Sequence, residues 1–410
     1  MGRVRRLTYP PPPGHGNLSG KPPSMDPVYL DHAATTPVRP EVREAMLPYL
    51  GGVFGNPSST HRWGREAAAA LAEARAEIAA ALGARFPEIH FVRGGTESDN
   101  LAVLGRVARL RGEGATPTVA VSAVEHKAVL DAARHATARG AGRFVTLGVA
   151  ADGALDLDAL DVALRDGPAV VSVMWVNNET GSILPVEEVA ARTREAGATF
   201  HTDAVQAVGK LPVRVDRVDV DLLTATGHKL YGPKGTGLLF VREGTWLSPL
   251  LHGGGQERAL RPGTEDVAGA VGLAVAIRLA LADMETEAAR LGALRDRLEA
   301  SLSDAVAGLR VNGGAGPRAP HIASVAVPGV DGQELVMALD LAGVAISGGS
   351  ACNSGAGGGS HVIAALYGAH DAHATVRFSL GRSTTLDAVD RVAAVTAGTV
   401  ARLQALEAAP

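Results

Sequence analysis

The sequence predicts an α/β protein with two domains: a large one built on a largely parallel, seven-stranded sheet, and a smaller α/β domain at the C-terminal end. Short β-branched or aliphatic runs alternate with alanine-rich helical stretches over most of the chain. Pro185 stands where a helix should begin, and Gly83 and Gly197 stand where helices should end. From about Glu265 the pattern changes to long helices. Strands that alternate with helices indicate a parallel sheet with helices on both faces.

The expected strands of the large sheet are the seven apolar runs 89–92, 118–122, 144–147, 169–174, 199–201, 220–225 and 238–241. The expected helices of this part are 65–82, 100–110, 127–138, 156–164 and 186–196. After them we expect two long helices, at 265–284 and 287–307, and then a second group of strands and helices that forms the small domain.

This order divides the chain into four parts. Residues 1–24 are expected to be a disordered tail, because three arginines precede a proline-rich stretch and no apolar segment of a secretory signal follows. Residues 25–43 are expected to join the small domain, 44–284 to form the large domain, and 285–410 to form the small domain. Met25, just before the first ordered-looking segment, is an alternative start.

Composition narrows the class of protein. The 410 residues are 46% hydrophobic and 20% charged, which is usual for a globular protein, and the formal net charge is −4. No long basic run favours nucleic acid or an anionic membrane surface, and no uninterrupted apolar stretch predicts a bilayer span. The single cysteine excludes an internal disulfide framework and a multi-cysteine metal site, so we predict no metal and a reducing, cytoplasmic location.

Polar residues gather directly after five of the predicted strands. The carboxyl ends of parallel strands meet at one edge of a sheet, where such sheets bind ligands, so we expect these groups to lie together. In chain order they are Gly94, Gly95, Thr96 and Glu97; Glu125 and His126; Asn177, Asn178 and Glu179; Asp203 and Gln206; and Thr226, His228 and Lys229. One such group is weak evidence, whereas five at one edge predict a binding site.

Lys229 is the candidate for a lysine that forms an imine with pyridoxal phosphate. Of the five lysines, it alone follows a predicted buried strand through a short polar sequence, while Lys127 begins a helix and Lys210 and Lys234 are expected in loops. Partial burial favours the neutral amine that forms imines. The alternative is a solvated surface lysine, which is the usual state of this residue type.

The other requirements of pyridoxal phosphate are an acid for the ring nitrogen, a phosphate nest and a flat partner for the ring. Asp203 ends a predicted buried strand, where a carboxylate needs a cationic partner. The N–H groups after Gly95 and the Thr96 hydroxyl suit a phosphate. His126 can stack on the ring, and Asn178 can donate to its phenolic oxygen. Asp203 can instead be an N-cap carboxylate, and the turn at Thr96 can be an unspecific one. His126 can be an ordinary hydrogen-bonded histidine, and Asn178 a structural amide.

Cys352 lies among glycines and hydroxyl residues rather than among apolar ones, in a stretch that is glycine-rich as far as Gly359. Such a stretch predicts an exposed, mobile loop, and an exposed thiol favours a reactive role over a structural one. Downstream, Arg377 and Arg382 offer guanidinium groups for a substrate carboxylate. Arg377 is preferred because it follows a short run at 374–376 that predicts a strand. Either arginine can instead form a surface salt bridge.

With these residues assembled, the chain from Tyr29 onward resembles the long-loop group of cysteine desulfurases, which are class-V aminotransferases with the fold type I architecture of pyridoxal-phosphate enzymes. The stretches that carry the resemblance are YLDHAATTP (29–37), GNPSS (55–59), GTESDN (95–100), EHK (125–127), VNNE (176–179), DAVQ (203–206), GHKLYGPKG (227–235), GGGQER (253–258), SAC (350–352) and RFSLGR (377–382). Gly95 departs from the alanine that the family often has there, and the loop after Cys352 lacks the larger residues of relatives.

The resemblance implies a role for each candidate. Lys229 would hold the cofactor, Asp203 would pair with its ring nitrogen and His126 would stack on the ring. Asn178 and Gln206 would bind the phenolic oxygen. The phosphate would be held by Thr96, Thr226 and His228, joined by Thr264 from a second subunit, so that a homodimer completes each site.

The implied reaction takes sulfur from L-cysteine and leaves L-alanine. Arg377 would bind the substrate carboxylate, His126 would shuttle protons, and Cys352 would hold the sulfur as a persulfide for an acceptor, an iron–sulfur scaffold or a transfer-RNA thiolation enzyme. The alternatives are a selenocysteine lyase or an aminotransferase on the same fold, which the fold alone does not separate. A non-catalytic sulfur-transfer scaffold is disfavoured, because an unused buried acid and lysine are costly.

Overall fold

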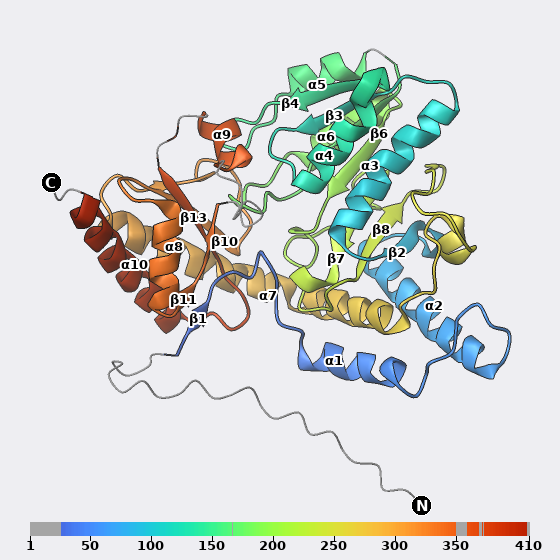
Figure 1. Ribbon diagram of the computed structural model, residues 1–410, viewed down its shortest axis with the longest axis horizontal. Helices are drawn as coiled ribbons and strands as arrows, with labels where there is room; N and C mark the ends of the chain where they lie inside the picture. Colours follow the sequence, from blue (N-terminus) through green and yellow to red (C-terminus); the bar gives the residue numbers. More distant parts are fainter. Residues whose placement is uncertain (1–25, 166, 350–358, 369–370, 372, 408–410) are drawn as a thin grey trace, which may run out of the picture.

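The computed structural model describes residues 26–165, 167–349, 359–368, 371 and 373–407. The predicted tail at 1–24 and the predicted loop cysteine, Cys352, lie outside these residues. The described residues form a seven-stranded sheet, a four-stranded sheet and a two-stranded pair, and a single long helix links the two larger sheets (Figure 1).

The large sheet has the strand order β2-β8-β7-β6-β5-β3-β4. Its strands are β2 (Ile89–Val92), β3 (Thr118–Ser122), β4 (Arg143–Leu147), β5 (Ala169–Ser172), β6 (Thr199–Asp203), β7 (Leu222–Thr226) and β8 (Gly237–Val241). Within this sheet β8 runs antiparallel to both of its neighbours, and the other adjacent pairs are parallel. The predicted seven-stranded, largely parallel sheet is therefore confirmed, and each predicted run overlaps one strand.

The helices of this part are α1 (Pro40–Met46), α2 (Arg62–Leu82), α3 (Gly95–Gly112), α4 (Lys127–Thr137), α5 (Leu157–Leu164) and α6 (Val186–Glu195). Gly83 ends α2 in the left-handed conformation, with φ of 71°, which glycine adopts at little cost. At the start of α5, the Asp156 side chain accepts a hydrogen bond from Ala159 N. We did not predict α1, which is short and has proline at its first position.

The smaller sheet is antiparallel, in the order β12-β13-β10-β9. Its strands are β9 (Arg310–Val311), β10 (Ile322–Val327), β12 (Ser347–Gly348) and β13 (Ala374–Ser379). Strand β1 (Val28–Tyr29) pairs with β11 (Val344–Ala345), and Asp31 bridges to Ser379, so the N-terminal segment is attached to this part. The helices here are α8 (Gly332–Leu341), α9 (His361–Tyr367) and α10 (Leu386–Glu407).

A single helix, α7 (Val267–Ala305), replaces the two helices predicted at 265–284 and 287–307. No proline or glycine separates the two predicted segments, so nothing in the backbone ends the first. Figure 1 shows α7 running from the large part of the molecule to the small one. By length and composition alone α7 could cross a membrane, but half of its most apolar stretch is buried and it packs on α1, α2, α10 and β10, as a core helix does.

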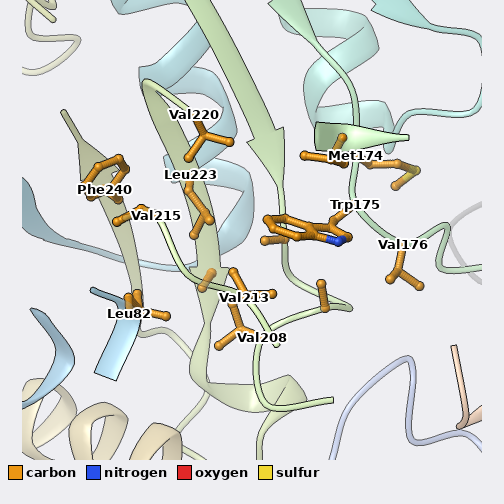
Figure 2. Packing of buried hydrophobic residues seen from close by; sticks show 14 of the residues in the cluster. Leu82, Met174, Trp175, Val176, Val208, Val213, Val215, Val220, Leu223 and Phe240 are labelled. Carbon is orange, nitrogen blue, oxygen red and sulfur yellow. The ribbon is translucent and has the colours of Figure 1, made fainter. Parts of the chain in front are cut away.

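Two separate apolar cores lie along this helix. The larger core includes Phe240 and Leu223, which are register partners on β8 and β7, together with Leu82 at the end of α2 (Figure 2). The smaller core joins Leu298 and Leu302 of α7 to strands β10 and β13 and helix α10. Each fully buried leucine or phenylalanine contributes about 1.5–3 kcal/mol relative to exposure. Each sheet therefore has its own stabilising core, and the carboxyl edge of the large sheet faces the small part.

Candidate active site

The first part of the site is the start of α3, directly after β2. Gly94 precedes the helix with φ of 127°, a conformation that L side chains rarely adopt. A Cβ atom on Gly237 of β8 would lie 2.8 Å from Gly94 Cα, so glycine is needed there for the close approach. The first N–H groups of α3, from Gly95 and exposed Thr96, have no carbonyl partner in the preceding turn. This helix start presents donors and a positive dipole end to an anion.

Lys229 closes a short 3-10 turn, η4 (Gly227–Lys229), which follows β7 without an intervening loop. Its Nζ donates to the carbonyl oxygens of Ala33 (2.7 Å) and Ala34 (2.6 Å). These carbonyls belong to the N-terminal segment, which is also attached to the small sheet. The lysine therefore lies between the two sheets, at the carboxyl edge of the larger one.

Asp203 is the last residue of β6, next to β7, and is buried. Its Oδ1 accepts a hydrogen bond from Val205 N at 2.9 Å. Burial raises the pKa of this carboxyl, while the nearby charges of His126 and Lys229 lower it. These electrostatic effects place the three predicted residues in one neighbourhood, where a cation would stabilise the carboxylate further.

His126 precedes α4 and caps it, because its Nδ1 accepts a hydrogen bond from Ala128 N at 3.1 Å. An accepting Nδ1 places the proton of a neutral imidazole on Nε2. The ring is half-buried. The cap thus fixes the ring orientation and leaves Nε2 as the donor.

The structure gives existing partners to several residues that were predicted to bind the cofactor. The Thr226 hydroxyl donates to Thr236 O at 3.0 Å, and His228 Nδ1 is 3.2 Å from Thr35 Oγ1. Burial and the charge of Lys229 lower the pKa of His228 to about 4, so the ring is neutral at pH 7. Gln206 Nε2 donates to Ala33 O at 2.9 Å, and its Oε1 lies 3.1 Å from His321 Nε2. Gln206 and His228 both contact the 33–36 segment that also receives Lys229.

Arg377, in the middle of β13, is 2% exposed. Its guanidinium forms a 2.8 Å ion pair with Asp31 and donates to the backbone carbonyl of Asn178 at 2.7 Å. Its Nε has no hydrogen-bond partner among the described residues. Arg377 thus brings the small sheet up against the segment between β5 and α6, where Asn178 contributes its backbone carbonyl.

The sequence analysis did not predict the burial of several ionisable groups. Glu125 accepts from the Ser122 hydroxyl and from Met174 N, both at 2.6 Å, and burial raises its pKa to about 8. Glu179, whose pKa burial raises to about 7, accepts from Ser360 Oγ at 2.5 Å. Lys210, expected in a loop, has a partly buried side chain beside Lys229. The polar runs after the strands contained the two glutamates, but only tertiary packing shows their burial.

Thr264 is exposed in this chain and follows Gly263 in a loop before α7. The loop is fixed by ion pairs of Arg261 with Glu97 and of Arg93 with Asp266, both 2.9 Å long. These pairs attach the loop to the start of α3. The role of Thr264 in a second subunit stays a prediction.

The described residues fit pyridoxal phosphate. A lysine and a buried carboxyl influence each other electrostatically, a capped imidazole lies beside them, and a helix start with unpaired N–H groups suits the phosphate. Lys229, Asp203, His126 and the Gly95–Thr96 turn would hold the group.

Comparison with known proteins agrees with this arrangement. The family model "Aminotransferase class-V" matches residues 28–392. A cysteine desulfurase of Gluconacetobacter diazotrophicus is 46% identical over 382 residues, which are 93% of this chain and 95% of the relative. Among solved structures, a NifS-like protein is 32% identical with a TM-score of 0.84, over 92% of this chain and 100% of that one. SspA in complex with cysteine is 34% identical with a TM-score of 0.75, over 86% and 98%. The chain therefore belongs to the class-V aminotransferase family, and its relatives there are cysteine desulfurases.

Proposed function

We propose that the protein is a pyridoxal-phosphate-dependent cysteine desulfurase that converts L-cysteine to L-alanine and holds the sulfur as a persulfide on Cys352. The observation that carries this proposal is the convergence of Lys229, Asp203 and His126 at the carboxyl edge of the large sheet. The similarity to cysteine desulfurases along nearly the whole chain supports the choice of substrate.

Bound pyridoxal phosphate supplies an electron-withdrawing ring, which stabilises negative charge at the substrate α-carbon. Asp203, whose carboxylate form is destabilised by burial, would pair with the protonated ring nitrogen. The Ala128 N–H holds the His126 imidazole in one orientation, from which its Nε2 would exchange protons with the substrate. Lys229 would form the covalent bond to the cofactor; in this structure its Nζ donates to the carbonyls of Ala33 and Ala34.

The proposed role of Cys352 separates desulfuration from transamination, whereas an arginine for the substrate carboxylate serves either reaction. Arg377 orients the substrate carboxylate from the small sheet, and Cys352 accepts the substrate sulfur. An aminotransferase needs no thiol, so its reaction would not depend on Cys352.

The test is the release of alanine from L-cysteine by the wild type and by Cys352→Ala under the same reducing conditions. The variant should still bind the cofactor and change its absorption spectrum when cysteine is added, but alanine and sulfide release should collapse. Lys229→Ala should lose catalysis at the earlier step, and the double variant should be no worse than the worse single variant. Near-equal alanine release by the wild type and Cys352→Ala would refute the desulfurase function, and keto-acid products with an amino acceptor would indicate an aminotransferase.

The partners proposed for the enzyme are a second copy of this chain and a sulfur-acceptor protein, either an iron–sulfur scaffold or a transfer-RNA thiolation enzyme. Large apolar side chains are exposed near the loops of the large part, among them Leu50 (68%), Phe54 (73%) and Trp246 (67%). Exposed apolar groups of this size favour a protein interface. A homodimer would cover them and would bring Thr264 of one subunit to the phosphate site of the other. A cytoplasmic location, which keeps a lone reactive thiol reduced, is proposed with it.

A further inference from the structure

The first turn of α3, where the phosphate of the cofactor would bind, contains a carboxylate of its own. Glu97 lies two residues after Gly95 in this turn. Its Oε2 accepts a hydrogen bond from Arg93 N at 2.7 Å, so the side chain folds back toward the start of the helix. A carboxylate at this position stabilises the helix, but it also repels any second anion that binds the same helix start. A cation beside Glu97 would remove this repulsion.

Arg261 is that cation. Its Nε donates to Glu97 Oε1 at 2.9 Å, and the two side chains are only 17% and 25% exposed, so solvent screens their charges incompletely. The other arginine at the helix start, Arg93, pairs with Asp266 at 2.9 Å. Glu265 lines the same small cavity as Arg261 and adds a further carboxyl group. Without Arg261, the start of α3 would therefore have an excess of negative charge.

The loop before this arginine begins in an uncommon backbone conformation. Glu257, Arg258 and Ala259 have φ values of 46°, 58° and 62°, which residues other than glycine rarely adopt. The buried Glu257 side chain accepts two hydrogen bonds from Arg75, at 2.8 and 2.6 Å, and one from Phe91 N at 3.0 Å. Backbone strain of this kind persists where the surroundings impose it. The strained turn is thus fixed to β2, the strand that leads into α3, so the same strand supports the loop and the helix start.

We propose that Arg261 is a positioning residue for the phosphate: it neutralises Glu97, so that the N–H groups and the dipole of α3 attract an anion without repulsion from the carboxylate of the same turn. An ion pair with this exposure contributes little to the free energy of unfolding, so its effect is on the local charge. This inference rests on the proposed binding of the cofactor phosphate at this turn, but not on any sulfur transfer.

The experiment measures binding rather than turnover. The full-length chain without cofactor is titrated with pyridoxal phosphate and with pyridoxal, and the ratio of the two dissociation constants gives the preference for the phosphate. Arg261→Met should lower this preference about fivefold or more. Arg261→Lys keeps the charge and should stay near the wild type. Arg109→Met is the matched control, because that arginine pairs with Glu113 at the far end of α3, and it should leave the preference unchanged.

A second pair of variants separates charge neutralisation from direct contact with the phosphate. Glu97→Gln removes the carboxylate but keeps an acceptor for the Arg93 N–H, so its preference should equal or exceed that of the wild type. In the double variant Arg261→Met/Glu97→Gln the preference should return to the wild-type value, because no carboxylate is left to neutralise. A double variant as weak as Arg261→Met would overturn the proposal. A loss of preference in Glu97→Gln would overturn it equally, even where Arg261→Met does not fold.

These titrations contain no cysteine, so their result is independent of the Cys352→Ala test. A wild type that binds pyridoxal phosphate no more tightly than pyridoxal would contradict the phosphate site, and the role of Arg261 with it. A wild type that prefers pyridoxal phosphate, with the predicted losses and recovery in the variants, would support the role of Arg261 even if alanine release did not depend on Cys352. In that case only the desulfurase function would be refuted.

Discussion

Arg377 of the small sheet and Asp31 of the N-terminal segment form a 2.8 Å ion pair at the edge of the site. The same guanidinium donates to Asn178 O, in the segment between β5 of the large sheet and α6. A substrate carboxylate that binds Arg377 must therefore share it with Asp31 or use its unpaired Nε. The planar guanidinium carries five donors in a fixed geometry, so it can bind a carboxylate through two parallel hydrogen bonds from different nitrogens, which the single nitrogen of a lysine cannot.

We therefore expect Arg377→Lys to raise the KM for L-cysteine by about tenfold or more, a loss of about 1.4 kcal/mol, with a smaller effect on kcat. Arg382→Lys is the control, because that arginine was the other candidate and its half-exposed side chain pairs with Asp283 instead. Steady-state kinetics of both variants check this. Equal KM changes in the two would remove Arg377 from carboxylate binding.

The attachment site of the cofactor is directly measurable. Borohydride treatment of the yellow enzyme should bleach it and fix the cofactor on Lys229, which is the lysine at the end of β7 and beside Asp203. Peptide mapping by mass spectrometry identifies the modified residue. Lys210 is the most informative alternative, because its side chain lies beside Lys229, and an adduct there would contradict the assignment of Lys229.

Thr264 can be tested for action across the dimer by mixing chains. A heterodimer of Lys229→Ala and Thr264→Ala chains should contain one complete site if Thr264 serves the partner, and should have about half of the wild-type activity. If Thr264 serves its own chain, neither site is complete. The control heterodimer combines Lys229→Ala with Asp203→Ala, two residues of one site, and should not regain activity. Differently tagged chains, purified through both tags, supply each heterodimer, and activity no higher than that of Thr264→Ala alone would contradict the shared site.

Glu125 should make stability depend on pH. Burial raises the pKa of its carboxyl to about 8, from about 4.3 in an unfolded chain, so the folded protein favours the protonated form. The contribution of Glu125 to the free energy of unfolding is complete below about pH 4.3. It falls by about 1.4 kcal/mol per pH unit as the pH rises from about 4.3 to about 8. Glu125→Gln should therefore lose less stability than the wild type between pH 6 and 8.

Denaturant unfolding at the two pH values measures this difference. Glu187→Gln, at an exposed position of α6, is the control and should follow the wild type. An identical pH dependence in Glu125→Gln and the wild type would show that this carboxyl is ionised throughout.

The pattern of residues along the chain was sufficient to predict the strands and many of the candidate site residues. Buried strands such as β2 and β3 are short runs rich in β-branched and apolar residues, and the chain itself determines which residue follows each run. Lys229, Asp203 and His126 were therefore predicted from their position after a strand. The single helix α7 was predicted as two, because a change in residue pattern near residue 285 does not end a helix when no breaker is present.

The sequence by itself determined the sheet and the edge at which polar residues collect, and it selected Lys229 and Asp203 as the candidate lysine and acid, because strand pattern and chain order are local properties. Only the tertiary structure decided which charges are buried and paired. It placed Arg377 against Asp31, put the carbonyls of Ala33 and Ala34 against Lys229, and buried part of the Lys210 side chain, in its predicted loop, beside Lys229. Burial and pairing depend on residues far apart in the chain, and these interactions set the protonation of each group.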